Sequence, residues 1–392
     1  MEQEQERDVI IVGAGPAGAT TATILAQHGH DVLMLDRFDF PRDKACGDAI
    51  PAGAIELMAR LGMAEKVNQA VQRGEFYPLD SIRIYSPKGN LLQARLKEGA
   101  EGGRSYVAPR VYFDAVIQKQ AEESGAEFKR ALVKEPWIED GRVVGVQAQF
   151  NGDVKKIRSK IVVGADGVTS AITRTLRPKE MQHVDSHRAV ALRAYIHDIE
   201  EYPHEVEFYL YDEILPGYAW VFPAGKNLAN IGLGMRLDVF RKENYNLKQM
   251  LQKFLELPTI KKRILRGGEI ENIRTWQLNF GSQKQLQHTY DGALLVGDAA
   301  GFINPLTGGG IHNAMISAQM AGKTIDDALQ KGDTSRESIK IYEKRIHQAM
   351  WKNMRRSYFI QRWVLRFPSI ADIFFSYAAE DGILAKTFLE KL

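Results

Sequence analysis

The stretch Asp8–Asp36, DVIIVGAGPAGATTATILAQHGHDVLMLD, decides the fold. Its continuous apolar run, Val9–Val12, is typical of a strand buried on both faces of a parallel sheet. Gly13, Gly15 and Gly18 follow at G-x-G-x-x-G spacing. The first glycine permits a tight turn, the second lets the backbone approach a pyrophosphate, and the third allows close helix–strand packing. The stretch therefore predicts a dinucleotide site at the end of a buried strand.

The residues after the glycines support this prediction. A helix predicted over residues 17–28 points its first N–H groups at the phosphates. A second strand, predicted over 31–35, ends at Asp36, which is placed to accept hydrogen bonds from an adenosine ribose and would repel a 2′-phosphate. A merely structural glycine-rich turn would leave Asp36 unexplained.

Composition limits the remaining choices. A chain of 392 residues with 44% hydrophobic residues predicts two or three domains with a substantial core. No apolar run approaches the ~20 residues of a spanning helix, and the start MEQEQERD is unlike a signal peptide, so we expect a cytoplasmic location, with the inner face of a membrane left open. The single cysteine excludes an internal disulfide and a thiolate metal cluster, and no metal site is expected. A net charge of +3 argues against a nucleic-acid partner.

A loop rich in charge, glycine and proline is predicted over residues 37–51, at the sheet edge where doubly wound folds hold ligands. It contains Cys46. The charged residues near this thiol are Arg42, Asp43, Lys44 and Asp48. The cations would lower the pKa of the thiol and the acids would oppose them. Local composition leaves two interpretations of Cys46, a chemical group or a small residue that fits a crowded loop.

Two further turns repeat the pattern of an apolar strand, glycine and a helix. In the first, residues 161–163 lead into Ala165, Asp166 and Gly167, and we expect Asp166 both to face the nucleotide and to cap the following helix. In the second, a strand delivers Gly297 and Asp298, whose carboxylate would hold hydroxyls of a polyol chain.

The residues 308–311, Gly-Gly-Gly-Ile, then open a helix predicted over 311–329, whose positive N-terminus suits an electron-rich ring carbonyl. Three such turns converging on one ligand require a long ligand, and FAD fits better than NAD. Arg110 begins a helix predicted to continue over 111–124, and it either reaches a phosphate or the ribityl chain or lies on the helix surface.

Short alternating strands are predicted from Ala189 to Arg236, which indicates a second domain covering the cofactor. Tyr218, Trp220 and Phe222 lie two residues apart, hence on one face of a strand. They are either ordinary core or the wall of a cavity.

Taken together, these residues resemble the p-hydroxybenzoate-hydroxylase-like FAD enzymes and, within them, the geranylgeranyl reductase family. The shared marks are GAGPAG at 13–18, Asp36-Arg37, GADG at 164–167 and GDAAGFINPLTGGGI at 297–311. KACGD at 44–48 is similar to the family's K-x-C-G-[DG] loop, and YAWVFP at 218–223 to its Y-x-W-x-F-P motif.

The resemblance implies an α/β fold, with a Rossmann-type FAD-binding domain (1–80, 104–186 and 286–330), an inserted antiparallel-sheet substrate domain (81–103 and 187–285) and a C-terminal helical region (331–392). It implies that the FAD site is formed by Gly13, Gly15, Pro16, Ala17, Gly18, Asp36, Arg37, Lys44, Ala45, Arg110, Ala165, Asp166, Gly167, Gly297, Asp298, Gly308, Gly309, Gly310 and Ile311. It places Cys46, Gly47 and Asp48 at the reacting bond and Tyr218, Trp220, Phe222 and Pro223 around a prenyl-lipid substrate.

The activity that this resemblance implies is saturation of C=C bonds in an isoprenoid chain by hydride from reduced flavin. Flavin monooxygenation or halogenation is the alternative, because the aromatic motif is also similar to the W-x-W-x-I-P stretch of flavin halogenases; a flavoprotein that only binds lipid is a third. The chain has one dinucleotide fingerprint, so electrons must come from NAD(P)H that docks transiently or from a small electron-carrier protein.

Residues 351–370 combine five cations and five aromatic residues with no acid. Such a helix lies on a membrane surface or packs over the substrate domain. Helical spacing places Phe359 and Trp363 on the same side as the arginines, which favours packing.

Overall fold

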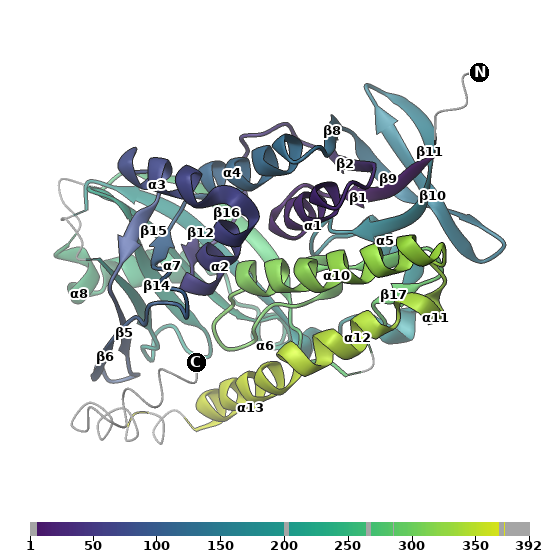
Figure 1. Cartoon of the computed structure of the whole chain (residues 1–392). Coiled ribbons are helices and arrows are strands. Elements are labelled where there is room, and N and C mark those ends of the chain that lie inside the picture. The colour runs from purple at the N-terminus through teal and green to yellow at the C-terminus, as the bar shows by residue number, and fades with distance from the viewer. Residues whose placement is uncertain (1–5, 200–203, 264–267, 285, 368–371, 373–392) are drawn as a thin grey trace.

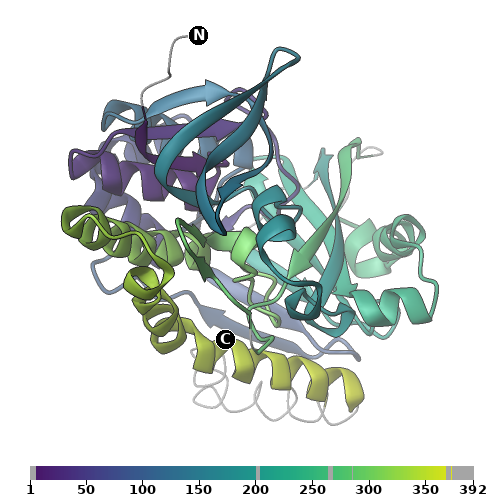
Figure 2. The same ribbon diagram turned by 90° about the vertical axis from the view of Figure 1, so that its right-hand side faces the viewer.

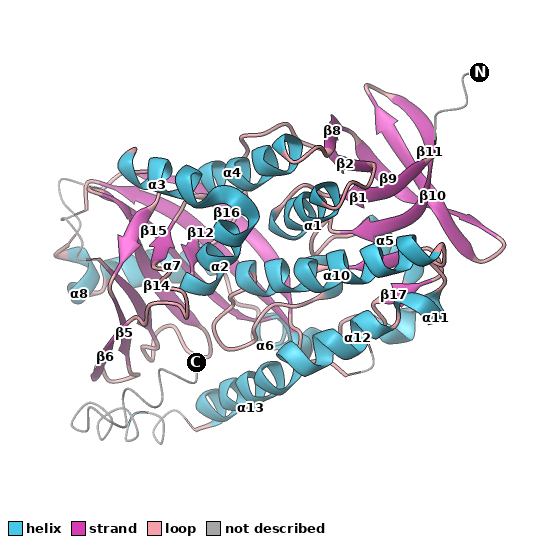
Figure 3. Cartoon of the chain, in the orientation of Figure 1, coloured by secondary structure: helices cyan, strands magenta, loops and turns pink. Residues whose placement is uncertain are grey.

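The computed structural model describes residues 6–199, 204–263, 268–284, 286–367 and 372. Two large sheets lie at the two ends of the molecule, with helices along one side (Figure 1, Figure 3). The predicted α/β fold class, with a parallel nucleotide-binding sheet, an antiparallel sheet and C-terminal helices, is confirmed.

The first sheet has eight strands in the order β17-β18-β11-β1-β2-β8, and β9 and β10 join it through β11. Its strands are β1 (Arg7–Val12), β2 (Val32–Asp36), β8 (Glu127–Arg130), β9 (Leu132–Glu139), β10 (Arg142–Phe150), β11 (Asp153–Gly164), β17 (Thr289–Tyr290) and β18 (Ala293–Leu295). β1 is central and pairs in parallel with β11 and β2. Its residues Val9, Ile10 and Ile11 are fully buried, as their unbroken apolar run predicted.

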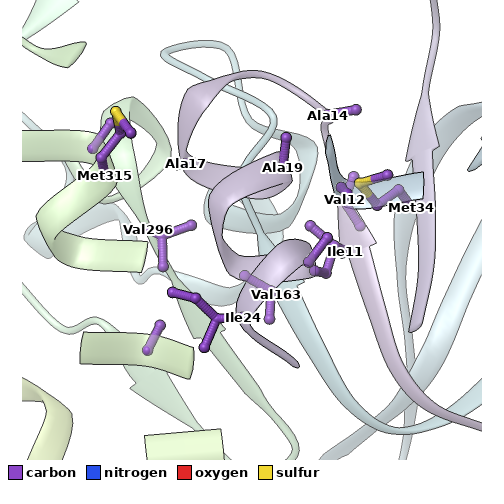
Figure 4. Close-up of a cluster of buried hydrophobic side chains, with 14 of the residues drawn as sticks. Ile11, Val12, Ala14, Ala17, Ala19, Ile24, Met34, Val163, Val296 and Met315 are labelled. Atoms are coloured by element: carbon purple, nitrogen blue, oxygen red, sulfur yellow. The ribbon is translucent and has the colours of Figure 1, made fainter. Parts of the chain in front are cut away.

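Helices α1 (Pro16–Gln27), α4 (Arg110–Glu123) and α10 (Ile311–Lys331) pack together beside this sheet. Figure 4 shows Ile24 of α1 between Val163 and Val296, with Met315 of α10 beyond them. Burial of this apolar layer fixes the start of α1 at the end of β1. The short helices α5 (Ala171–Leu176) and α9 (Gly297–Ala300) begin after β11 and β18.

β11 extends well beyond the strand predicted at 161–163. It is one strand of twelve residues. Its first half pairs antiparallel with β10 and its last residues pair in parallel with β1. The polar Arg158-Ser159-Lys160 segment interrupts the hydrophobic pattern where the strand passes from one pairing to the other.

The second sheet has seven strands in the order β16-β12-β15-β14-β13-β5-β6. They are β5 (Ser81–Tyr85), β6 (Leu91–Arg95), β12 (Arg188–His197), β13 (Glu205–Tyr209), β14 (Tyr218–Gly225), β15 (Leu228–Arg236) and β16 (Ile270–Asn279). β5 and β6 form a hairpin, and they enter this sheet because β5 pairs with β13. β16 was not predicted; its residues are mostly exposed and polar.

The remaining elements connect the two sheets. Helix α2 (Ala52–Met58) continues through a π-helical turn (Ala59–Met63) into α3 (Ala64–Gln72). A small sheet contains β3 (Ala49–Ile50), β4 (Tyr77–Leu79) and β7 (Ser105–Val107). Helices α6 (Leu237–Lys242), α7 (Leu247–Glu256) and α8 (Pro258–Lys261) accompany the second sheet, and two 3-10 turns lie at Lys179–Met181 and Asp185–His187.

The C-terminal helices run along one edge of the molecule, as the yellow end of the ribbon shows (Figure 2). They are α11 (Arg336–Ile339), α12 (Ile341–Ile346), a π-helical turn (His347–Trp351) and α13 (Lys352–Arg366). The helix predicted over 351–370 ends at Arg366, and residues 368–370 lie outside the described residues. None of the helices in the described segments combines the length and apolar character needed to cross a bilayer.

The aromatic side chains of α13 were predicted to pack over the substrate domain. Tyr358 does pack, with its ring stacked 4.3 Å from that of His187. The prediction is wrong for Phe359, Trp363 and Phe367, which are 59%, 44% and 44% exposed. The arginines and these rings share one side of the helix, and that side faces outward.

Candidate active site

One cavity of about 1790 Å³ extends from the first sheet to the second. It brings together nearly all the residues that the sequence assigned to a cofactor. The lining members of that set are Gly13, Gly15, Pro16, Ala17, Asp36, Arg37, Lys44, Ala45, Arg110, Ala165, Asp166, Gly167, Asp298, Gly308, Gly309, Gly310 and Ile311. Three strand–glycine–helix turns, distant in sequence, therefore face one space.

The first turn requires its glycines. Gly13 has φ +98°, and a Cβ there would lie 2.4 Å from the carbonyl oxygen of Ala165. Gly18 and Gly297 do not line the cavity. A Cβ at Gly18 would lie 1.8 Å from the Gly13 oxygen, and one at Gly297 would lie 2.8 Å from the Ala17 Cβ. These two glycines permit close packing behind the cavity instead of approaching a ligand.

Asp36 holds this turn from the adjacent strand. Its Oδ2 accepts a hydrogen bond from the Ala14 N–H at 2.9 Å, and its Oδ1 accepts one from the Phe38 N–H at 3.0 Å. Arg42, a cavity residue that the sequence did not assign to the cofactor, lies 3.9 Å from Asp36 and donates to Asp114 at 3.0 Å. The buried Nε of Arg42 has no partner among the described residues.

Arg110 is only 3% exposed, so its interpretation as a helix-surface residue is wrong. It donates through Nε and Nη2 to the two carboxylate oxygens of Asp114, at 2.5 and 2.6 Å. The acid four residues later was the available sequence signal, because that spacing places both side chains on one helix face. The pair fixes a cation in the cavity wall.

Ser170 is the N-cap of α5, because its side chain accepts a hydrogen bond from the Thr173 N–H. Asp166 supports the start of the same helix, and its predicted contact with the nucleotide stays a prediction. Its Oδ2 accepts from the Ala171 N–H at 2.7 Å in the first turn of α5. Its Oδ1 is buried at the cavity without a partner among the described residues. Burial raises the pKa of this carboxyl above its usual value.

The third turn is tied to the Cys46 loop. Lys44 Nζ lies 3.1 Å from Asp298 Oδ2, and the Tyr218 hydroxyl donates to the Thr307 carbonyl oxygen at 2.7 Å. Together with the unpartnered atoms of Arg42 and Asp166, these turns form a long, polar channel with open backbone at its glycines. These polar groups fit FAD: the first turn would hold the phosphates, and the start of α10 would face the ring.

Cys46 lies in the cavity wall, partly buried. The pKa of its thiol is raised, first by burial and second by the charge of Asp48, which outweigh Arg110 and Lys44. The nearby cations therefore do not lower the pKa of the Cys46 thiol below its usual value. The thiol stays protonated at neutral pH, so Cys46 is suited to hold a proton and not to act as a thiolate.

Gly47 brings the Cys46 loop against the aromatic residues of β14. A Cβ there would lie 3.0 Å from the Phe222 ring and 3.6 Å from Trp220 Nε1. Tyr218, Trp220 and Phe222 line the cavity. Pro223 does not, because strand alternation turns it to the opposite face, and its predicted contact with substrate is not supported. Further apolar lining comes from Leu79, Ile82, Ile84, Leu96, Val206 and Phe208.

Asp48 is fully buried and has a left-handed backbone, with φ +64°. Its Oδ2 accepts hydrogen bonds from the Tyr195 hydroxyl at 2.5 Å and from Asn230 Nδ2 at 2.7 Å. Burial raises the pKa of this carboxyl to about 6, although the bonds from Tyr195 and Asn230 oppose the rise. Tyr195 and Asn230 were not predicted, because nothing local marks either residue.

The raised pKa of Asp48 predicts a pH dependence of stability. Between its usual 3.8 and about 6, the folded protein binds this proton more tightly than the unfolded chain does. The contribution of Asp48 to the free energy of unfolding is therefore largest below pH 3.8. It is lost as the pH rises through about 6, and the change is on the order of 3 kcal/mol. Asparagine does not ionise, so the Asp48→Asn variant does not lose this contribution as the pH rises. The unfolding temperature of the variant minus that of wild type should therefore increase by a few degrees from about pH 4 to about pH 7.

A matched control is Asp140→Asn, the same substitution at an exposed residue whose φ is +47°. Its difference from wild type over the same pH range is the reference for the Asp48→Asn difference. If thermal unfolding showed a constant difference for Asp48→Asn relative to this reference, the carboxyl would have an ordinary pKa in the folded protein.

Comparisons with known proteins agree with this geometry. The family described as "FAD binding domain" matches residues 6–357. Digeranylgeranylglycerophospholipid reductase 2 of Methanopyrus kandleri is 33% identical over 363 residues, covering 89% of this chain and 84% of that protein. Digeranylgeranylglycerophospholipid reductase of Methanocella arvoryzae is 31% identical over 378 residues, covering 93% and 88%.

Solved structures show the same relationship. A geranylgeranyl bacteriochlorophyll reductase-like protein of Thermoplasma acidophilum has a TM-score of 0.85 at 26% identity, covering 96% of this chain and 92% of that one. A flavin-dependent brominase has a TM-score of 0.81 at 21% identity, covering 99% and 93%. The second similarity extends to the fold alone.

Proposed function

The chain belongs to the geranylgeranyl reductase family of FAD-dependent oxidoreductases, and on this premise we propose that it saturates C=C bonds in the isoprenoid chains of a glycerophospholipid. The observation that carries the proposal is the continuity of one cavity. The three glycine turns and the β14 aromatic residues line the same cavity. The Cys46 loop contacts both, through Lys44 with Asp298 and through Gly47 with Phe222.

Reduction of an isolated alkene needs a hydride at one carbon and a proton at the other. Bound FAD supplies the hydride when it has been reduced. Because an unactivated alkene has no carbonyl to stabilise developing charge, placement and exclusion of water must lower much of the barrier. Trp220 and Phe222 place the chain and exclude water, and the protonated Cys46 thiol holds the proton beside them.

After transfer, the proton on Cys46 must be restored from solvent. The two electrons come from NAD(P)H or from a small electron-carrier protein. The single G-x-G-x-x-G fingerprint fits either donor, because neither then needs a second dinucleotide domain in this chain.

The test is the mass of the product. The purified flavoprotein is reduced without oxygen, mixed with lipids that carry geranylgeranyl chains, and the lipids are extracted. A gain of two hydrogens for each double bond supports the proposal. Insertion of oxygen or halogen once air and halide are supplied, without saturation, would establish the monooxygenase or halogenase alternative.

We also propose that α13 binds the surface of a membrane. Ile360 and Gln361 of this helix line the cavity, while Phe359 and Trp363 are exposed. The cations of the helix are Lys352, Arg355, Arg356, Arg362 and Arg366. Exposed rings among cations suit an anionic membrane surface, and a substrate with long prenyl chains resides in a membrane.

We therefore expect Phe359→Ser combined with Trp363→Ser to reduce binding to anionic phospholipid vesicles about tenfold or more, because the rings supply the apolar contact. Vesicle co-sedimentation measures this. The control is Val154→Ser, which removes an apolar side chain that is 56% exposed on β11. Figure 1 shows β11 and α13 at opposite ends of the molecule. Equal vesicle binding by all three proteins would exclude α13 as the contact.

A further inference from the structure

One buried amide contacts three of the residues on which the proposed function rests. Asn230 lies in β15 and is 0% exposed. Its Oδ1 accepts a hydrogen bond from Trp220 Nε1 at 2.9 Å. Its Nδ2 donates to the carbonyl oxygen of Cys46 at 2.8 Å and to Asp48 Oδ2 at 2.7 Å. The amide therefore joins the aromatic wall to both sides of Gly47.

The three hydrogen bonds use both N–H donors and the carbonyl acceptor of the Asn230 side chain. An amide group has two N–H donors and one carbonyl acceptor. Both donors go to the Cys46 loop and the acceptor goes to Trp220. Aspartate has the same shape without the donors, and alanine has none of the three groups. In a buried site, each lost partner also leaves another polar atom unsatisfied.

The sheet register places this amide opposite the loop. Asn230 pairs with Phe222 of β14 on one side and with Tyr195 of β12 on the other. The Tyr195 hydroxyl donates to the same Asp48 Oδ2 that Asn230 contacts. Three neighbouring strands thus direct polar or aromatic groups at the short segment from Cys46 to Asp48.

That segment needs such support. Asp48 has φ +64°, a conformation that is unfavourable in a residue with a side chain and persists when its surroundings hold it. Its carboxylate is held by Asn230 and Tyr195. The Asp48 N–H in turn donates to Cys46 Sγ at 3.3 Å. The orientation of the thiol is therefore set by the residue that Asn230 holds.

We propose that Asn230 is a positioning residue that locks the aromatic wall of the isoprenoid cavity to the Cys46 loop. Through this amide, the Trp220 ring and the Cys46 thiol keep one relative placement around the double bond to be reduced. The role of this lock in alkene reduction rests on the proposed function. The hydrogen bonds that form the lock are present in the protein without substrate.

The chain offers a direct probe of the lock, because Cys46 is its only cysteine. The rate at which iodoacetamide alkylates the FAD-loaded protein therefore reports on Cys46 alone, through how exposed its Sγ is and how readily the thiol ionises. Asn230→Ala should raise this rate about threefold or more, since the loop is released. Trp220→Phe, which removes the indole N–H, should also raise it. The double variant should be no faster than Asn230→Ala, because both changes open the same connection.

A control for simple loss of stability is Tyr342→Phe. It removes a buried hydrogen bond, from the Tyr342 hydroxyl to the Leu295 carbonyl oxygen, outside the cavity. Its alkylation rate should equal that of wild type. Unchanged alkylation in Asn230→Ala, or rate increases that multiply in the double variant, would overturn the lock.

Steady-state kinetics test the purpose of the lock. Asn230→Asp keeps the shape and loses both donors, so kcat for alkene reduction should fall about tenfold or more while KM changes about twofold or less. A change in KM alone would assign Asn230 to substrate binding and contradict a positioning role. If wild type reduces no prenyl lipid, the proposed function fails, whereas the alkylation result still decides whether the lock exists.

Discussion

Replacing Cys46 with alanine is expected to leave a yellow protein and to lower the rate of prenyl-chain reduction about a hundredfold or more. The thiol lies where the Cys46 loop meets the aromatic wall, and its raised pKa keeps it protonated at neutral pH. Its removal takes away the proton held beside the alkene. We expect the flavin turns to stay intact, because Cys46 accepts its hydrogen bonds from the Asp48 N–H and from Asn230 Nδ2, which both lie outside those turns.

The measurement is single-turnover formation of saturated product by protein with equal flavin content. Cys46→Ser is the companion variant, since it keeps a hydrogen-bond donor of similar size but is a much weaker acid. It should fall between wild type and Cys46→Ala. Near-normal turnover in Cys46→Ala would remove this residue from the chemistry.

Gly13→Ala is expected to abolish FAD binding. The new Cβ would lie 2.4 Å from the Ala165 carbonyl oxygen, at a backbone φ of +98°. The first and second turns would have to separate, and both are needed around the same ligand. Absorbance of flavin released from the purified protein measures the effect, with less than about a tenth of wild-type content expected.

Gly29→Ala is the control, because it introduces backbone strain without a steric clash. Gly29 also has a left-handed backbone, with φ +84°, but no atom lies within 4 Å of an added Cβ. It should cost about 1 kcal/mol of stability and retain FAD. Full flavin content in Gly13→Ala would show that the first turn does not hold the cofactor.

The nucleotide half could be predicted from the sequence because its signals are local. Each turn places an apolar strand, glycines and a helix within about thirty consecutive residues, and the parallel sheet then brings the three turns to one edge. The same holds for Cys46 and the aromatic residues of β14. Their side chains belong to short motifs whose geometry follows from loop position and strand alternation.

The contacts between the two halves could not be predicted in this way. Asn230 and Tyr195 meet Asp48 only when β12 and β15 pair and the Cys46 loop packs on them. In the sequence they are ordinary residues of alternating strands. Arg110 shows the same limit, since its burial depends on the assembled fold.

The most direct test of the account is a single turnover without oxygen. Protein whose FAD has been fully reduced is mixed with a lipid that carries geranylgeranyl chains, and flavin absorbance and product mass are followed together. The account predicts that the yellow colour returns as one double bond gains two hydrogens for each flavin reoxidised. Flavin that stays reduced until air is admitted, with the lipid unchanged, would contradict it.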